Sequence, residues 1–262
     1  MITAANVKEL RDRTGVGMAD CKNALVETDG DIEMAIDVLR KKGIAKAAKR
    51  SGNETSEGRI KIIIEGSDAF VAAVSCETDF VARNDTFEGM LDAFIALRKE
   101  CADDASAIAQ AEDLKASEYT LKVGENMKIL ALTKISGEVV VSYVHSNFKT
   151  GAVVVAKAGT DPEKLKMVAM HVVASQPQVI SPDDVSEEFV KHEMDIALEL
   201  MKQDPKNDGK PADILEKIVA GKMAKIKEEN ALITQPFVVS PDQKVGEFIG
   251  KDAIVRFERY AI

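Results

Sequence analysis

The sequence predicts an α+β protein in which a small helical module precedes a duplicated core of helices and strands. Three observations support this fold class. The first 50 residues carry apolar side chains at helical spacing. Two later segments share the order of hairpin, helix and closing strand, and the second copy is interrupted by a long charged helical stretch. A length of 262 residues suits one large or two modest domains.

The N-terminal segment predicts three short helices within residues 3–42. Thr3 is expected to cap the first helix, and Thr14 and Gly15 to end it, because these residue types favour such positions. Residues 44–50 extend the helical pattern, whereas residues 51–57 have the polar composition of a flexible connector. We therefore expect a helical module over residues 1–50 and a linker over residues 51–58.

The first half of the core follows, and we place it at residues 59–137. Two strands rich in Ile and Val are expected at 59–65 and 69–76, joined by a Gly-Ser-Asp hairpin turn. A helix with an apolar face is expected at 86–101, further helical segments reach Lys122, and a third strand covers 127–135.

The second half repeats this order over residues 138–181 and 231–262. Strands are expected at 138–145 and 152–158, a helix begins at Thr160-Asp161-Pro162, and the closing strand covers 253–260. Thr78-Asp79 and Thr160-Asp161 occupy equivalent places, which indicates an internal duplication. The alternative is a chance similarity between two short β-β-α units.

The insertion at residues 182–230 predicts an antiparallel helical hairpin that breaks at residues 204–209. Its apolar seam can remain internal, which we favour, or pair with another copy of the chain. The seam consists of Val190, Met194, Ala197, Leu198, Met201, Ile214, Ile218, Met223 and Ile226.

Composition and charge narrow the class of partner. The formal net charge of -9 argues against a protein that grips nucleic-acid phosphates, so the expected partner is a protein. No apolar run approaches the length of a membrane span, and the start lacks the pattern of a signal peptide. The three cysteines have no paired spacing, which predicts neither a disulfide framework nor a cysteine metal site. Together these features favour a cytoplasmic protein.

No pattern in the sequence predicts a cofactor, a metal or catalysis. Gly15-Val16-Gly17 lacks the third glycine of a dinucleotide loop, and Gly221-Lys222 lacks the flanking residues of a phosphate loop. His145, His171 and His192 are isolated, so solvated or structurally bonded histidines are favoured over metal ligands. Enzymatic activity is disfavoured because the carboxylates form no convergent titratable cluster.

The stretch from Ser75 to Asp85 is the most informative part of the chain. A strand that ends at Glu77-Thr78-Asp79 should turn there, because Thr and Asp side chains bond nearby backbone amides. Phe80 is therefore expected at a corner, either folded back into the core or offered to another protein as an anchor.

Five motifs carry a family resemblance that spans nearly the whole chain in the expected order. The sequence resembles the bacterial elongation factor Ts family, the guanine nucleotide exchange factors of elongation factor Tu. The motifs are VKELRDRTGVGMADCKNAL at 7–25, TDFVARN at 78–84, GEN at 124–126, AMHVVASQP at 169–177 and QPFVV at 235–239. The resemblance implies that the N-terminal module is similar to ubiquitin-associated (UBA) domains and that the core is duplicated with an inserted hairpin.

The resemblance also implies which residues contact the partner GTPase. Asp79 and Phe80 correspond to a wedge that disturbs the partner's magnesium site, with Thr78 and Val81 shaping the turn. The other implied contact positions are Arg11, Met18, Ala19 and Lys22 in the N-terminal module, Val123, Gly124 and His145 in the core, and Val238 and Val239 near the C-terminal end. Val7, Leu10, Cys21 and Leu25 are expected to form the core of the module itself.

Two departures from the family pattern and two other function classes remain open. Many members carry a further C-terminal helical module, whereas this sequence ends at Ile262, so we expect that contact to be absent or substituted. The loop sequence HSNFKTGA from His145 places its detailed contacts in question. A homodimer or heterotetramer through the hairpin is also open. The alternative functions are an interaction adaptor that uses the UBA-like module, and an α+β enzyme with an unrecognised pocket.

Overall fold

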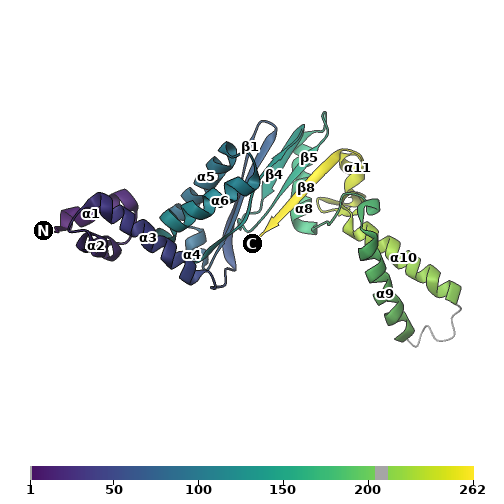
Figure 1. Ribbon diagram of the computed structural model, residues 1–262. Helices are drawn as coiled ribbons and strands as arrows, with labels where there is room; N and C mark the ends of the chain where they lie inside the picture. Colours follow the sequence, from purple (N-terminus) through teal and green to yellow (C-terminus); the bar gives the residue numbers. More distant parts are fainter. Residues whose placement is uncertain (1, 204–211) are drawn as a thin grey trace. The chain divides into compact units, whose positions relative to one another are not determined.

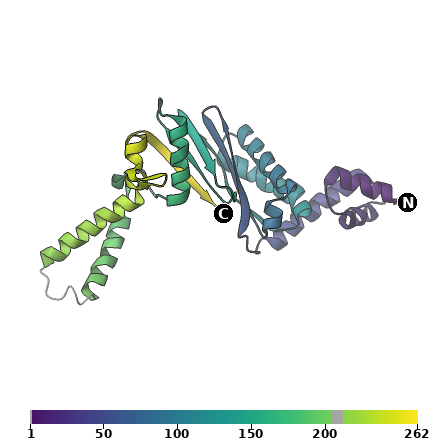
Figure 2. The same cartoon turned by 180° about the vertical axis from the view of Figure 1, so that it is seen from behind.

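A computed structural model describes residues 2–203 and 212–262, which form two compact units. One unit comprises residues 2–135, 144–151 and 260–262, and the other comprises residues 136–143 and the described part of 152–259. Figures 1 and 2 show the chain from opposite sides. Helices and small sheets coexist in both units, which confirms the predicted α+β class.

The N-terminal module contains the three predicted helices, α1 (Ala4–Thr14), α2 (Met18–Glu27) and α3 (Ile32–Arg50). The Thr3 hydroxyl caps α1 by accepting from the Asn6 amide, and Gly15 ends this helix with a φ of 68°. The four residues expected to form its core are buried: Val7, Leu10, Cys21 and Leu25. Residues 44–50 continue α3 without a break.

The first sheet has the order β1-β2-β3, formed by β1 (Glu57–Glu65), β2 (Asp68–Cys76) and β3 (Met127–Ser136). β1 and β2 are antiparallel, and Glu65 faces Asp68 across the predicted turn. The positive φ of Gly66 allows this tight reversal. β1 begins two residues before the expected position, so the last residues of the predicted linker belong to the sheet.

Helices cover one face of this sheet, with α5 and α6 in front of it in Figure 1. Side chains of α5 pack against β2 and α6 to form the core of this half, including Phe87, Met90, Leu91 and Phe94. The segments between β2 and β3 are α4 (Asp79–Ala82), α5 (Asp85–Glu100), α6 (Asp104–Leu114), the π-helix η1 (Lys115–Tyr119) and α7 (Thr120–Val123).

α3 packs closely against η1 and α7 within the same unit. Gly43 permits this approach, because a Cβ atom built at this position would lie 2.7 Å from the Ala116 carbonyl oxygen. Real Cβ atoms do not approach backbone oxygens so closely, so any larger residue at position 43 must displace one of the two helices.

The second unit repeats the arrangement with a β4-β5-β8 sheet and α8 packed on it. Figure 2 shows α8 in front of these strands. Residues Ala152 and Val154 of β5 meet Leu165 and Val168 of α8 in the core. The elements are β4 (Val139–Val144), β5 (Thr150–Ala156), α8 (Pro162–Ser175), η2 (Pro182–Asp184), η4 (Leu232–Thr234), β6 (Pro236–Phe237), β7 (Ser240–Lys244), α11 (Val245–Ile249) and β8 (Ile254–Ala261).

The insertion forms the predicted helical hairpin from α9 (Glu187–Gln203) and α10 (Ala212–Asn230), which lie side by side in both views. Its seam is internal over much of its length, since Val219 and Met223 are buried against Val190 and Leu198. The predicted break at 204–209 and the Met201 side chain lie outside what the structure describes. Several apolar side chains remain exposed, so self-association through the hairpin stays a prediction. These are Phe189, Met194, Ile196, Leu200 and Ile214.

Two helical glycines allow a matched test of the contact between α3 and η1. We expect Gly43→Ala to lower the free energy of unfolding by about 1–3 kcal/mol, the usual cost of overpacking, despite the better helix propensity of alanine. Gly89→Ala in α5 meets no atom within 4 Å, so it should stabilise by about 0.4–1 kcal/mol. Urea unfolding of both variants measures these signs, and a stabilising Gly43→Ala would contradict the close contact.

Candidate functional site

The corner after β2 is a one-turn helix with a side-chain cap at its start, and the next helix is capped directly after it. The Thr78 hydroxyl accepts a hydrogen bond from the Val81 amide at 3.4 Å and so begins α4. Asn84 follows directly and caps α5, because its side chain accepts from the Phe87 amide at 2.7 Å. Two successive caps leave the four residues of α4 little conformational freedom.

The ring of Phe80 points away from the protein at this corner. Its exposed fraction is 84%, whereas Val81 and Ala82, the next two residues, are buried in the core of the first unit. The buried pair therefore anchors α4 from below. A core position for Phe80, the alternative left open by its residue type, is excluded by this exposure.

Asp79 lies beside the ring and carries its charge at the surface. Its carboxylate is 3.5 Å from the Arg83 guanidinium one turn later, and the Arg83 side chain is exposed whereas that of Asp79 is half-buried. A surface pair of this kind contributes at most about 1 kcal/mol to stability. Asp79 is therefore available to a partner at little cost.

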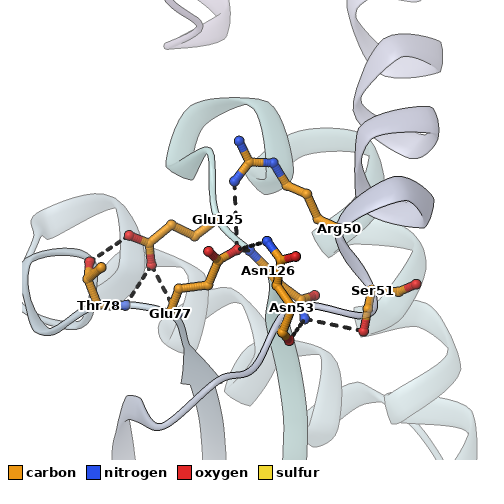
Figure 3. A network of polar contacts seen from close by, with 7 residues as sticks. All are labelled: Arg50, Ser51, Asn53, Glu77, Thr78, Glu125 and Asn126. Carbon is orange, nitrogen blue, oxygen red and sulfur yellow. Dashed lines mark hydrogen bonds and ion pairs between the residues drawn. The ribbon is translucent and has the colours of Figure 1, made fainter.

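Glu125 braces the strand end that precedes the corner (Figure 3). One carboxylate oxygen accepts from the amides of Glu77 and Thr78 at 3.1 and 3.0 Å. The other oxygen accepts from the Thr78 hydroxyl at 2.5 Å. A single side chain thus satisfies the two backbone amides that follow β2 and the Thr78 hydroxyl.

Glu77 makes the reciprocal contact with the segment that carries Glu125. Its carboxylate accepts from the Asn126 amide at 2.6 Å and from the Asn53 side chain at 3.0 Å, and the Arg50 guanidinium is 3.7 Å away. These partners, with the Asn126 amide the largest contributor, hold the pKa of Glu77 below its usual range. Glu77 therefore stays ionised and remains an acceptor.

Asn126 connects this arrangement to the residues that follow α3. Its buried side chain donates to the carbonyl oxygens of Ser51 and Asn53, at 3.4 and 2.8 Å. Residues 51–53, expected to be a flexible connector, are thus hydrogen-bonded to the loop before β3 (Figure 3). Composition alone does not indicate these hydrogen bonds, because they come from a residue distant in the sequence.

Cys76 closes the strand end from the core side. Its thiol donates to the Thr78 carbonyl oxygen at 3.2 Å. Burial, together with the nearby Glu125 charge, raises the pKa of Cys76 to about 12. The sulfur is therefore a neutral thiol that helps to pack the corner, and it does not serve as a nucleophile.

Two further predicted contact positions, Val123 and Gly124, directly precede Glu125 in the sequence. Val123 is half-buried against the core of the first unit, and Gly124 ends α7 with a φ of 77°. This left-handed residue reverses the chain, so the next residue, Glu125, turns back towards Thr78. The structure thus brings positions 123–124 together with the Thr78 corner.

The loop that begins at His145 also belongs to the first unit. His145 is exposed, and the following residues 146–149 line a groove with Asp79 and Arg83. Phe148 adopts a φ of 58° and lies beneath the Arg59 guanidinium at 4.1 Å. The predicted position 145 is therefore on a loop that reaches the corner.

The predicted contacts of the N-terminal module lie on exposed parts of α1 and α2. Met18, Ala19 and Lys22 share one shallow groove, which Val7 also lines. Arg11 is exposed as well, but it does not line this groove. Three of the four predicted residues therefore line one groove, which Arg11 does not line.

Val238 and Val239 lie at the tip of the β6-β7 hairpin in the second unit. They are 48% and 56% exposed, so neither side chain belongs to a buried core. They occupy the turn because Phe237 pairs with Ser240. Phe237 is buried below them and stacks on Phe248.

His171 holds this hairpin from inside the second unit. Its Nδ1 accepts from the Val238 amide at 3.1 Å, and its Nε2 lies 2.9 Å from the Gln235 side-chain oxygen. The ring is fully buried, and burial lowers its pKa below the ordinary value of 6.5. This pattern fits the neutral ring with its proton on Nε2, and it bears out the structurally bonded role expected of this histidine.

Sequence reasoning did not identify the residues that brace the corner. Glu125 and Asn126 lie in the GEN motif, but nothing in that motif indicates contacts with Glu77 and Thr78. Asn53 was assigned to a connector by composition alone. The only available signal was the presence of a charged residue directly after a helix-ending glycine.

Within residues 2–203 and 212–262, no group of three or more His, Cys, Asp and Glu side chains is arranged to hold a metal ion. A search of the same residues for membrane spans finds no helix with the required length and apolarity. The features of the corner that a partner could contact are the exposed Phe80 ring and the Asp79 carboxylate, both on a rigid backbone.

Comparison with known proteins gives one consistent result. A family model described as "Elongation factor TS" matches residues 77–262. Elongation factor Ts from Ectopseudomonas mendocina is 44% identical over 265 residues, covering 100% of this chain and 91% of that protein. The Serratia proteamaculans protein of the same name is 42% identical with the same coverage. The Marinobacter nauticus protein is 44% identical over 252 residues, covering 95% and 86%.

The lowered pKa of His171 predicts a pH dependence of stability. The folded protein excludes a proton that the unfolded chain binds with a pKa of 6.5. The contribution of the neutral His171 ring to folding stability is therefore complete above about pH 6.5. It decreases as the pH falls towards the lower pKa of the folded state. Thermal unfolding between about pH 7.5 and 5.5 should show a falling midpoint for the wild type and a flatter profile for His171→Gln.

His192→Gln is the matched control, because His192 is exposed on α9. We expect this variant to keep the wild-type pH profile. Equal slopes for the wild type and His171→Gln would contradict the proposed role of the buried ring.

Proposed function

This chain belongs to the elongation factor Ts family and is a translation elongation factor, and we propose that it acts as the guanine nucleotide exchange factor of elongation factor Tu. One observation carries the proposal. Phe80 is 84% exposed on a one-turn helix whose following residues are buried. Such a ring is suited to insertion between helices of a partner, which is the role that the family resemblance implies for it.

The proposed mechanism is a change in the partner's binding equilibrium. A GTPase holds its nucleotide through backbone amides, a lysine and a magnesium ion. The factor binds elongation factor Tu with GDP, and insertion of Phe80 beside Asp79 disturbs the magnesium site. The nucleotide-free form is then favoured, and the factor weakens GDP binding as much as GDP weakens binding of the factor. No covalent step is required.

Magnitudes indicate that the corner does not act alone. Burial of one Phe side chain contributes about 1.5–3 kcal/mol, which corresponds to roughly tenfold to a hundredfold in an equilibrium constant. Larger coupling requires additional docking surfaces. The exposed Met18 and Lys22 on α2, and Val238 and Val239 on the β6-β7 tip, support such surfaces on separate parts of the chain.

The test is stopped-flow release of a fluorescent GDP analogue from elongation factor Tu. We expect Phe80→Ala to lower the catalysed release rate about tenfold to a hundredfold, because the ring is the group that is newly buried in the partner. The free energy of unfolding of the Phe80→Ala variant should differ from that of the wild type by less than about 0.5 kcal/mol, since the Phe80 side chain is mostly exposed.

Phe189→Ala provides the matched control, because Phe189 is an exposed ring on α9, which belongs to the other compact unit. This variant should retain the wild-type rate. A Phe80→Ala variant that releases GDP as fast as the wild type would disprove the wedge. Complex formation by the wild type without faster release would instead support the adaptor function.

A further inference from the structure

We propose that Glu125 is a positioning residue for nucleotide exchange, which holds the Thr78 corner so that Phe80 is presented in one orientation. This inference rests on the proposed function and identifies a residue that acts through Phe80. Glu125 lies 47 residues from Thr78 in the sequence, and its carboxylate is the main polar contact of the strand end (Figure 3).

Glu125 determines the orientation of the Thr78 hydroxyl. A hydroxyl has one hydrogen to donate and two lone pairs to accept. An ionised carboxylate only accepts, so the Thr78 hydrogen is directed to Glu125 at 2.5 Å. The lone pairs are then free to accept from the Val81 amide and cap α4. Glu125 therefore sets the geometry of the cap that begins the helix bearing Phe80.

The Glu125 side chain also binds the backbone at the end of β2. The same carboxylate accepts from the amides of Glu77 and Thr78, which fixes the direction in which the chain leaves β2. A change in these two bonds would rotate α4 as a unit about its buried residues. The exposed ring would then sample several directions instead of one.

The residue next to Glu125, Asn126, is itself held in place by hydrogen bonds. The Asn126 amide donates to Glu77 at 2.6 Å, and the buried Asn126 side chain donates to the carbonyls of Ser51 and Asn53. The residue that positions the corner is thus itself held by neighbours from β2 and from the segment after α3. A residue can hold a binding group in one orientation only if its own position is fixed by neighbouring residues.

A positioning role differs from a contact role in what it should change. The Glu125 side chain is partly buried, and its carboxylate accepts hydrogen bonds from Glu77 and Thr78 at the corner. Preorganisation lowers the ordering cost of insertion. Loss of the brace should therefore lower the maximal rate of GDP release more than it raises the concentration needed for half-maximal rate, because the other docking surfaces are intact.

The experiment measures release of a fluorescent GDP analogue from elongation factor Tu over a range of factor concentrations. Glu125→Ala should lower the maximal rate about tenfold, a factor that corresponds to about 1.4 kcal/mol. Glu125→Gln keeps the volume and one oxygen for the backbone amides, so its loss should be smaller. Glu65→Ala is the control, because Glu65 pairs with Lys99 at the opposite end of the same hairpin.

A double-mutant cycle with Phe80→Ala separates positioning from general destabilisation. If Glu125 acts through the ring, Glu125→Ala has no further effect on release once Phe80 is removed. An equal slowing in both backgrounds overturns the inference, and so does a wild-type maximal rate in Glu125→Ala. Should Glu125→Ala fail to fold, Thr78→Val removes the same hydroxyl bond and enters the same cycle with the same expectation.

The wild-type measurement distinguishes this inference from the proposed function. If the wild type does not accelerate GDP release, the proposed function fails and the role of Glu125 fails with it. If the wild type accelerates release and Phe80→Ala slows it, while Glu125→Ala does not, the exchange function stands and only the positioning role is overturned.

Discussion

The carboxylate of Glu125 at the end of β2 is the contact on which the corner depends. A strand that leaves its sheet exposes backbone amides, and each needs a partner. Here one side chain accepts from two such amides and from the Thr78 hydroxyl. The direction of the chain, the cap of α4 and the exposure of Phe80 all follow from this arrangement. An exposed aromatic ring otherwise has no reason to keep one orientation, because its own contacts with the protein are few.

Rigidity at the corner matters because the binding energy of a single ring is modest. Each side chain or loop that must be ordered on association costs roughly 0.5–1.5 kcal/mol, a large part of what burial of a Phe contributes. A ring that is already ordered retains more of that contribution. The buried Val81 and Ala82 fix α4 from the core, while Glu125 fixes it from the strand end. The two supports are of different kinds, one apolar and one polar, and they constrain different directions of motion.

The sequence predicted the parts of the fold that depend on local patterns. Helical spacing gave α1–α3, β-branched runs gave the strands, and the Thr78 cap was visible from residue type. The remaining features depend on contacts distant in sequence. Residue type does not tell an exposed Phe80 from a buried one, and only the motif favoured exposure. Glu125 was missed because its partners lie 47 and 48 residues away. Composition likewise does not indicate that Asn126 hydrogen-bonds to the segment after α3 from 73 residues away.

Glu77 and Glu125 show how two carboxylates at the corner can fix geometry through hydrogen bonds with the backbone. In an enzyme, such groups often have environments that separate their pKa values so that one donates and the other accepts a proton. Here the pKa of Glu77 is lowered by donors, and both carboxylates act only as acceptors. Each binds the backbone of the segment that carries the other, so neither segment can move without breaking bonds to both. The two charges therefore fix the geometry of this strand end.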